Sequence, residues 1–310
     1  MAKRVLAIVG AIAIVLAATA IRAAWTDGDD GQRGGGATAL SVVCDPDLAA
    51  ACQQLGDGVR VEVQDSEETS QALVEGELGD VDAWVTTSAW TELTAARLTD
   101  GRDALGAVRR LASAEVAVAT IDTRAPVLIG HCGPTPIWRC LGDVAGQPWT
   151  ALGGLDPWGD VRTGLPDADT ATGLAVLAAV AVGYFEGPAF AANDFAGFDT
   201  WLARLADPSG SGDRDVLATL VRRRGTYDAG GVLRHAAAER PEVEVLDTLP
   251  AVSVDAVIAP LGDPSTGPLV DDLRAALVDE GWRAADGDPV PLLGRGVMGA
   301  LHALWKDVTR

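Results

Sequence analysis

The feature that most constrains the fold is a regular alternation of two kinds of segment from residue 39 to the end of the chain. Short, mostly apolar runs typical of strands cover residues 39–44, 59–63, 81–85, 114–121, 161–164, 243–246 and 252–259. Segments with helical spacing cover residues 47–55, 66–77, 172–185, 199–206, 214–224, 230–239, 269–284 and 298–308. This alternation predicts an α/β protein whose mostly parallel sheets are covered by helices on both faces.

The first 26 residues predict an export segment. Lys3 and Arg4 precede an uninterrupted apolar run over residues 5–21, which is the order found in export signals. The run is also at the lower limit for a membrane-spanning helix, so a cleaved signal and a retained anchor both stay open, and its length favours the anchor. Residues 27–38 are rich in Gly and Asp and predict a flexible linker. Either form of the export segment places the rest of the chain outside the cytoplasm.

The charge of the chain excludes one class of partner. Asp and Glu number 44 against 24 Lys and Arg, which gives a net charge of −20. A chain this negative is repelled by a phosphate backbone, so we expect no binding to nucleic acid.

Four cysteines indicate an oxidising compartment. Cys44 and Cys52 have the same spacing as Cys132 and Cys140, and this spacing fits neither a zinc site nor a redox motif. Three pairings are possible, and we expect the two local ones, Cys44 with Cys52 and Cys132 with Cys140. Each would close a short loop, to which the chain-entropy model assigns about 2.5 kcal/mol of stability.

Motifs for catalysis and cofactor binding are missing from the sequence. Residues 294–299 read G-x-G-x-x-G, but the chain ends too soon afterwards for the βαβ unit that dinucleotide binding needs. His131, His235 and His302 are too scattered for a metal cluster, and there is no nucleophile elbow or phosphate-binding loop. We therefore expect no catalytic residues, no cofactor and no metal, although an exported hydrolase stays open.

Small polar residues gather where three of the predicted strands end. Ligands of open α/β sheets bind beyond the carboxyl ends of the strands, where hydroxyls and free helix N–H groups can hold a polar solute. The predicted ligand-binding residues are Asp45 after the first strand, Thr86, Thr87 and Ser88 at the third, and Asp169, Thr170, Thr172 and Gly173 before helix 172–185. Each group also fits an ordinary helix cap. Their convergence in one crevice is what favours a binding site.

The order of six segments resembles a known family. These are "SVVCDPDL", "VDAWVTTSAW", "AEVAVATIDTRAP", "CLGDVAGQPW", "VRTGLPDADTATGLAVLAAVAVGYF" and "VDAVIAP". In their order and spacing, residues 39–310 are similar to the type II extracellular solute-binding proteins, in particular to actinobacterial substrate-binding modules.

This resemblance implies two α/β lobes with a solute bound in the cleft between them. Lobe I would hold residues 39–120 plus 250–310, and lobe II residues 121–249. Strands 114–121 and 252–259 would cross between the lobes as a hinge. The family's cleft contacts map to the Asp45 loop, Thr87-Ser88 and Thr170–Thr172. Asp167 and Asp169 flank the helix cap, and their charges argue against a simple tetrahedral oxyanion as the solute.

Two functions follow from these observations. The first is a membrane-tethered or secreted receptor that captures a small polar solute and delivers it to an ABC-type membrane permease. The second is a surface sensory or interaction module that keeps the two-lobed scaffold without transport. A cleft filled by side chains, together with an exposed patch of tryptophans, would favour the second function. The candidates for such a patch are Trp84, Trp90, Trp138, Trp149 and Trp158.

Overall fold

A computed structural model describes residues 40–98, 104–206, 212–262 and 266–310 of the chain. These residues belong to one compact unit, Leu40–Arg310. The predicted export segment (residues 1–26) and the predicted linker (residues 27–38) lie outside the described residues. Within the described residues, no helix has both the length and the apolar character needed to cross a membrane.

The described strands form one mixed sheet in the order β2-β1-β3-β8-β4-β6-β5, with β7 and β9 also paired to β4. The strands are β1 (Leu40–Cys44), β2 (Val59–Val63), β3 (Ala83–Thr87), β4 (Arg109–Ile121), β5 (Thr163–Gly164), β6 (Ala229–Leu233), β7 (Val243–Leu246), β8 (Val252–Pro260) and β9 (Arg283–Ala284). Strand β1 pairs in parallel with β2 and β3, and β5 pairs in parallel with β6. All antiparallel pairs of the described strands involve β4 or β8.

Strands β4 and β8 connect the two ends of this sheet. β8 pairs with β3 on one side and with the first half of β4 on the other. The second half of β4, Val116–Thr120, pairs with β6. These strands contain the two segments, 114–121 and 252–259, that the family resemblance implies as crossings between lobes, and they lie side by side in antiparallel register. Their antiparallel pairing makes the sheet mixed, whereas the sequence predicted mostly parallel sheets.

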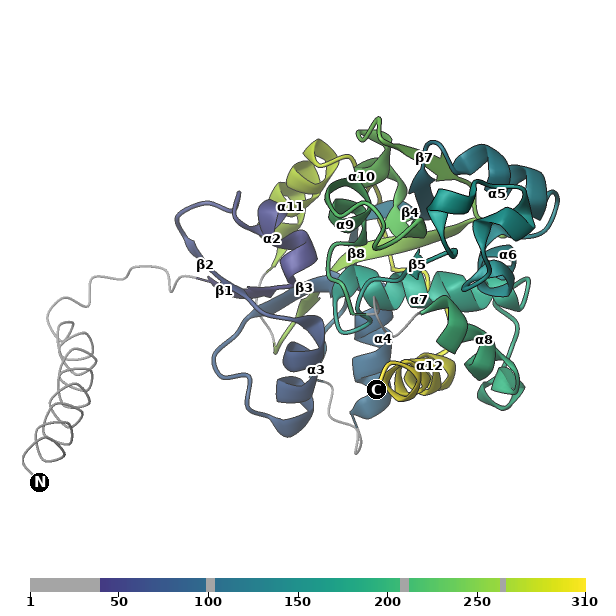
Figure 1. Ribbon diagram of the computed structural model, residues 1–310. Helices are drawn as coiled ribbons and strands as arrows, with labels where there is room; N and C mark the ends of the chain where they lie inside the picture. The colour runs from purple at the N-terminus through teal and green to yellow at the C-terminus, as the bar shows by residue number, and fades with distance from the viewer. Residues whose placement is uncertain (1–39, 99–103, 207–211, 263–265) are drawn as a thin grey trace, which may run out of the picture. The chain divides into compact units, whose positions relative to one another are not determined.

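Helices cover both faces of the sheet (Figure 1). The α-helices are α2 (Ala49–Cys52), α3 (Ser66–Glu75), α4 (Ser88–Arg97), α5 (Ala125–Cys132), α6 (Ile137–Val144), α7 (Ala171–Tyr184), α8 (Phe198–Leu205), α9 (Val216–Arg222), α10 (Arg234–Ala238), α11 (Gly267–Asp279) and α12 (Arg295–Val308). Short 3-10 turns cover Pro46–Leu48, Trp149–Leu152, Asp156–Trp158 and Ala192–Phe195.

Helix α7 is the central helix of the fold. Twelve of its fourteen residues are buried, so it has no polar face to turn towards solvent. It contacts β3, β4, β6 and β8 as well as helices α4, α6 and α12. Its first residues therefore lie deep among segments that come from distant parts of the sequence.

Two predicted helices are partly wrong. The predicted helix 269–284 ends at Asp279, and Arg283–Ala284 form strand β9. Residues 230–239 were expected to be a single helix, but the chain forms strand β6 first and only then the short helix α10. Gly231 explains the strand, because a Cβ at this position would lie 2.4 Å from a methyl carbon of Val176 on α7. Close packing of the β6 backbone against α7 thus overrides the helical spacing of the apolar residues.

The tryptophans belong to the core. Trp84, Trp90, Trp138 and Trp149 are buried, and Trp158 is half-buried. The exposed tryptophan patch that would favour an interaction module is therefore absent from the described part of the chain. The expected local disulfides are both present, Cys44–Cys52 and Cys132–Cys140.

Candidate functional site

The start of helix α7 is built from the sequence Asp167–Gly173. Thr170 is the N-cap, and its hydroxyl oxygen accepts a hydrogen bond of 3.0 Å from the N–H of Gly173. Gly173 is required by close packing, because a Cβ there would lie 1.7 Å from the carbonyl oxygen of Asp167. The cap leaves the N–H groups of Ala171 and Thr172 free for other acceptors.

Two carboxylates from the loop after β1 bind these N–H groups. Asp45 Oδ2 accepts a hydrogen bond from Ala171 N at 3.1 Å, and Asp47 Oδ2 accepts one from Thr172 N at 2.8 Å. We call this contact of Asp45 and Asp47 with Ala171 and Thr172 the β1–α7 junction. A helix N-terminus attracts anions, and here the chain itself provides them.

Asp45 also organises the loop on its own side of the junction. Its Oδ2 accepts a hydrogen bond from Ser66 N at 3.0 Å and a second from the Ser66 hydroxyl, and its Oδ1 accepts one from Asp47 N at 2.9 Å. The Ser66 hydroxyl is 2.7 Å from that of Thr86. Burial, with a smaller contribution from the charge of Asp47, raises the pKa of Asp45 to about 7, against the lowering effect of its hydrogen bonds with Ser66 and Asp47.

The end of β3 joins α7 through two further hydrogen bonds. The Thr87 hydroxyl donates to the carbonyl oxygen of Ala171 at 3.0 Å. The Trp90 indole N–H donates to the carbonyl oxygen of Thr170 at 2.8 Å. Ser88 is buried beside them at the first position of α4. The structure thus brings most of the predicted site residues together at the start of α7, and many of their polar groups bond to neighbouring groups of the chain.

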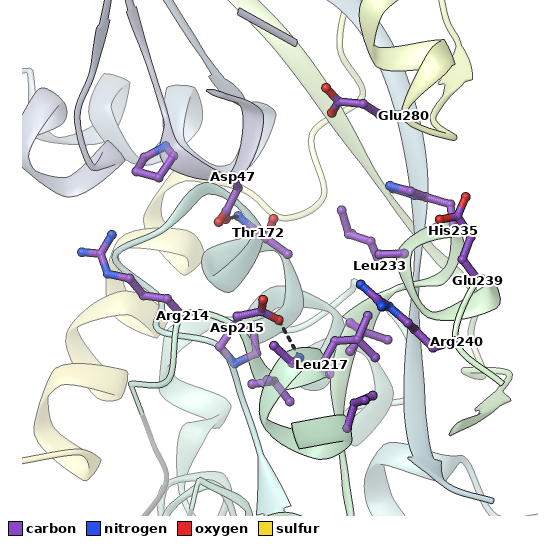
Figure 2. A pocket seen from close by; sticks show the side chains of 18 of the residues that line it. Asp47, Thr172, Arg214, Asp215, Leu217, Leu233, His235, Glu239, Arg240 and Glu280 are labelled. Atoms are coloured by element: carbon purple, nitrogen blue, oxygen red, sulfur yellow. Dashed lines mark hydrogen bonds between the residues drawn. The ribbon is translucent and has the colours of Figure 1, made fainter. Parts of the chain in front are cut away.

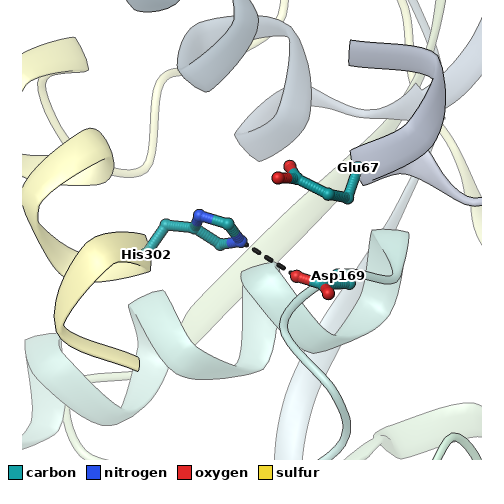
Figure 3. A group of neighbouring side chains, drawn as sticks. All are labelled: Glu67, Asp169 and His302. Atoms are coloured by element: carbon teal, nitrogen blue, oxygen red, sulfur yellow. Dashed lines mark hydrogen bonds and ion pairs between the residues drawn. The ribbon is translucent and has the colours of Figure 1, made fainter. Parts of the chain in front are cut away.

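Asp169 belongs to a separate network of charged side chains (Figure 3). Its Oδ1 lies 3.1 Å from His302 Nε2, and its Oδ2 forms an ion pair with Lys306. Arg97 forms an ion pair with Glu67 at 2.6 Å and lies 3.2 Å from His302 Nδ1. Burial alone would raise the pKa of Asp169, but the hydrogen bonds from His302 and Lys306 and the charge of Lys306 together lower it.

The group of Glu67, Asp169 and His302 has the ligand types of a metal site, but its ligand atoms are already engaged. Arg97 can only donate, so Nδ1 of His302 accepts and Nε2 carries the proton that is donated to Asp169. Arg97 and Lys306 also balance the charges of the two carboxylates. The arrangement therefore supports an ion-pair network rather than metal binding. Sequence reasoning missed this cluster because 133 positions separate Asp169 from His302.

A pocket of about 650 Å³ opens next to the β1–α7 junction (Figure 2). Its walls come from the loop after β1, from α9, β6 and α10, and from the end of α11. Thr172 is the only predicted ligand-binding residue among the described residues that line the pocket. Its hydrogen-bond partner in the junction, Asp47, also lines the pocket. The pocket could not be predicted from the sequence, because the apolar residues of its floor on α9 and β6 have the pattern of ordinary core residues.

The pocket has an apolar floor and charged walls of both signs. Some of the charges are engaged within the chain, because Arg214 pairs with Asp65 and Asp215 caps helix α9 through Ala218 N. Burial lowers the pKa of His235, with an opposing contribution from Glu239, which favours the neutral imidazole.

The fold is that of known solute-binding proteins. A periplasmic thiamin-binding protein matches with a TM-score of 0.55 and 10% identity over 87% of this chain and 96% of that one. A periplasmic binding protein from Actinobacillus pleuropneumoniae, solved with fructose-6-phosphate, matches with a TM-score of 0.52 and 12% identity over 87% and 96%. An ABC transporter protein from Clostridium perfringens matches with a TM-score of 0.50 and 10% identity over 87% and 100%.

These similarities are structural only. No protein-family model matches the sequence, and no curated protein matches it. At 10–12% identity the solved structures share the fold, and they confirm the expected two-lobed α/β architecture of periplasmic binding proteins.

Proposed function

We propose that the chain is an extracytoplasmic solute-binding receptor that holds a small polar ligand in the pocket of Figure 2. Lobe I consists of residues 39–120 plus 250–310 and lobe II of residues 121–249, with β4 and β8 as the hinge. The export segment brings the receptor to the outer side of the membrane, either anchored or secreted. A closer relation to the actinobacterial modules is part of this proposal.

The observation that carries the proposal is that the residues lining the pocket come from both proposed lobes. Asp47, Glu280 and Trp282 come from the proposed lobe I, whereas Leu233 and His235 come from the proposed lobe II. A ligand bound there would touch both lobes and favour their closed arrangement, which is how such a receptor signals occupancy. The volume of about 650 Å³ suits a small molecule.

The predicted strand-end residues have a second role in this proposal. Asp45, Thr87 and Thr170 hold the lobes together beside the ligand: Asp45 and Thr87 bond to the backbone of Ala171, and the Thr170 carbonyl oxygen accepts from the Trp90 indole. Asp47 and Thr172 lie where the junction meets the pocket, so they are the residues that couple closure to binding.

Delivery to a membrane permease is the proposed consequence of binding. A similarly folded protein is described as part of an ABC transporter, and another as a thiamin-binding protein. The ligand of this chain is a separate question, because the identities of 10% leave the residues of the site free to differ.

A ligand screen with a pocket-blocking variant tests the proposal. Thermal unfolding is measured with sugars, amino acids, small peptides, oxyanions and vitamins, and a ligand at 100 times its Kd should add about 2.7 kcal/mol of stability. Ala236→Trp fills the pocket from an exposed lining position, and it should abolish the shift. Ala238→Trp on the same helix, also exposed and outside the lining, is the matched control and should retain it. No shift with any compound, or an equal shift in both variants, would contradict the proposal.

One observation favours the second function, a sensory or interaction module without transport. The N–H groups at the start of α7 that could hold an anionic solute are bound by Asp45 and Asp47. The buried tryptophans count against an aromatic docking patch. The same screen separates the two functions, because a module without a solute gives no ligand-dependent shift.

A further inference from the structure

Glu280 is an unusual member of the pocket lining. It follows the last residue of α11, and its Oε1 is inaccessible to solvent and has no hydrogen-bond partner among the described residues. A carboxylate oxygen in this situation loses its hydration without compensation, which is unfavourable unless a donor approaches it. Burial accordingly raises the pKa of Glu280.

The surroundings of Glu280 suit a cation with an apolar body. Trp282 is buried two residues further on, and its ring centroid lies 5.4 Å from that of His235. Leu233 on β6 adds an aliphatic side chain to the same pocket. A pocket lined by a carboxylate and by aromatic rings suits a protonated amine with an apolar body, which gains an ion pair and contacts to the rings. Burial favours the neutral form of the His235 imidazole, so the cation that pairs with Glu280 has to come from the ligand.

Positive charges without ion partners line another part of the pocket. Arg222 ends helix α9 and Arg240 follows α10, and neither forms an ion pair with another described residue. Figure 2 shows Glu280 and Arg240 reaching the pocket from different segments, with Leu233 labelled between them. A ligand with a single charge would leave one of these two groups without a partner.

We propose that the pocket binds a small zwitterion with an apolar body, such as an apolar amino acid or dipeptide. Its ammonium group donates to Glu280, its carboxylate pairs with Arg240, and its apolar part lies against Leu233 and Trp282. This inference rests on the proposed function and specifies the class of its ligand.

Calorimetric titration with matched probes tests the inference. The probes are phenylalanine and leucylphenylalanine, each with a form that lacks the amino group and a form with a carboxamide in place of the carboxylate. At least one zwitterion should bind, and loss of either charged group should weaken its binding at least tenfold. Glu280→Gln should cause a similar loss for the zwitterion and should abolish the difference between amino and des-amino forms. Arg240→Gln should do the same for the carboxylate.

Two controls make the result interpretable. Glu244→Gln removes an exposed carboxylate on β7, outside the pocket, and should leave the Kd within twofold. The melting temperature of Glu280→Gln should equal or exceed that of the wild type, because the variant removes the charge of a half-buried carboxylate whose Oε1 has no partner among the described residues. An unfolded variant would contradict this account of Glu280.

The possible outcomes distinguish failure of this inference from failure of the proposed function. Binding of a sugar or an oxyanion that Glu280→Gln leaves unchanged would overturn the inference while the receptor function stands. Zwitterion binding that is indifferent to both Glu280→Gln and Arg240→Gln would also overturn it. Failure of every compound, including those of the wider screen, would overturn the proposed function itself.

Discussion

Asp45 and Ala171 are 126 positions apart, and the carboxylate of the first accepts a hydrogen bond of 3.1 Å from the backbone N–H of the second. This bond places a buried carboxyl group at the N-terminus of the most buried helix of the fold. An anion from solution would have to displace Asp45 to reach the same N–H group. The start of α7 is therefore a structural contact in this protein, and the ligand is expected beside it.

Removal of the Asp45 carboxylate should destabilise the fold strongly. Asp45→Ala leaves the N–H groups of Ser66 and Ala171 buried without an acceptor, which we expect to cost about 3 kcal/mol of unfolding free energy. Urea unfolding followed by circular dichroism measures the change. Asp57→Ala, at an exposed aspartate, is the control and should stay within about 0.5 kcal/mol of the wild type. A loss below 1 kcal/mol for Asp45→Ala would show that the junction is not a major contact.

Asp45 should also give the protein a defined pH dependence. Its pKa is about 7 in the folded state against an ordinary value of 3.8, so the folded protein holds a proton that the unfolded chain releases. Its contribution to stability is therefore fully present below pH 4 and is lost as the pH rises through 7, by up to about 1.4 kcal/mol per pH unit. Asp45→Asn cannot titrate, so the difference in unfolding free energy between it and the wild type should follow this curve. A difference that is constant from pH 4 to pH 8 would contradict the raised pKa.

The periodicity of the sequence predicts most of the helices and strands, because the burial of each element fixes the pattern of apolar residues within it. Helix α7 and strand β8 are recognisable from their apolar runs, since each is buried over nearly its whole length. The prediction of a helix over residues 230–239 failed because Gly231 lets the backbone pack against α7, a tertiary constraint that local spacing does not record. The antiparallel pairing of β4 with β8 is equally non-local, so it emerged only in three dimensions.

The candidate site could be predicted from the sequence only in part. Asp45, Thr87 and Thr170 could be predicted to converge because they follow strand ends or cap a helix, and they do meet. Their hydrogen bonds with the backbone of α7 were not predictable, because a cap and a ligand contact use the same residue types. Glu280 could not be singled out, since it lies within the predicted helix 269–284, where a glutamate is ordinary until its burial is known.

The two disulfides should differ in their contribution to stability although they close loops of equal length. Cys132→Ser with Cys140→Ser should cost about 2.5 kcal/mol, the value expected from chain entropy alone. Cys44→Ser with Cys52→Ser should cost more, because Cys44 is fully buried and immediately precedes Asp45. Unfolding of both double variants and of the wild type under oxidising conditions measures the difference. Equal losses would indicate that the first disulfide does not support the junction.

The packing of Gly173 predicts opposite effects for two glycine-to-alanine substitutions in helices. Gly173→Ala places a methyl group 1.7 Å from the carbonyl oxygen of Asp167, so the start of α7 must shift and we expect a loss of at least about 2 kcal/mol. Gly130→Ala lies in the exposed face of α5 with no atom within 4 Å, and its higher helix propensity should add up to about 1 kcal/mol. Thermal unfolding of the two variants measures both signs in one experiment. A Gly173→Ala protein as stable as the wild type would mean that Asp167 and α7 are not in contact, and the cap at Thr170 that positions the junction would lose its physical basis.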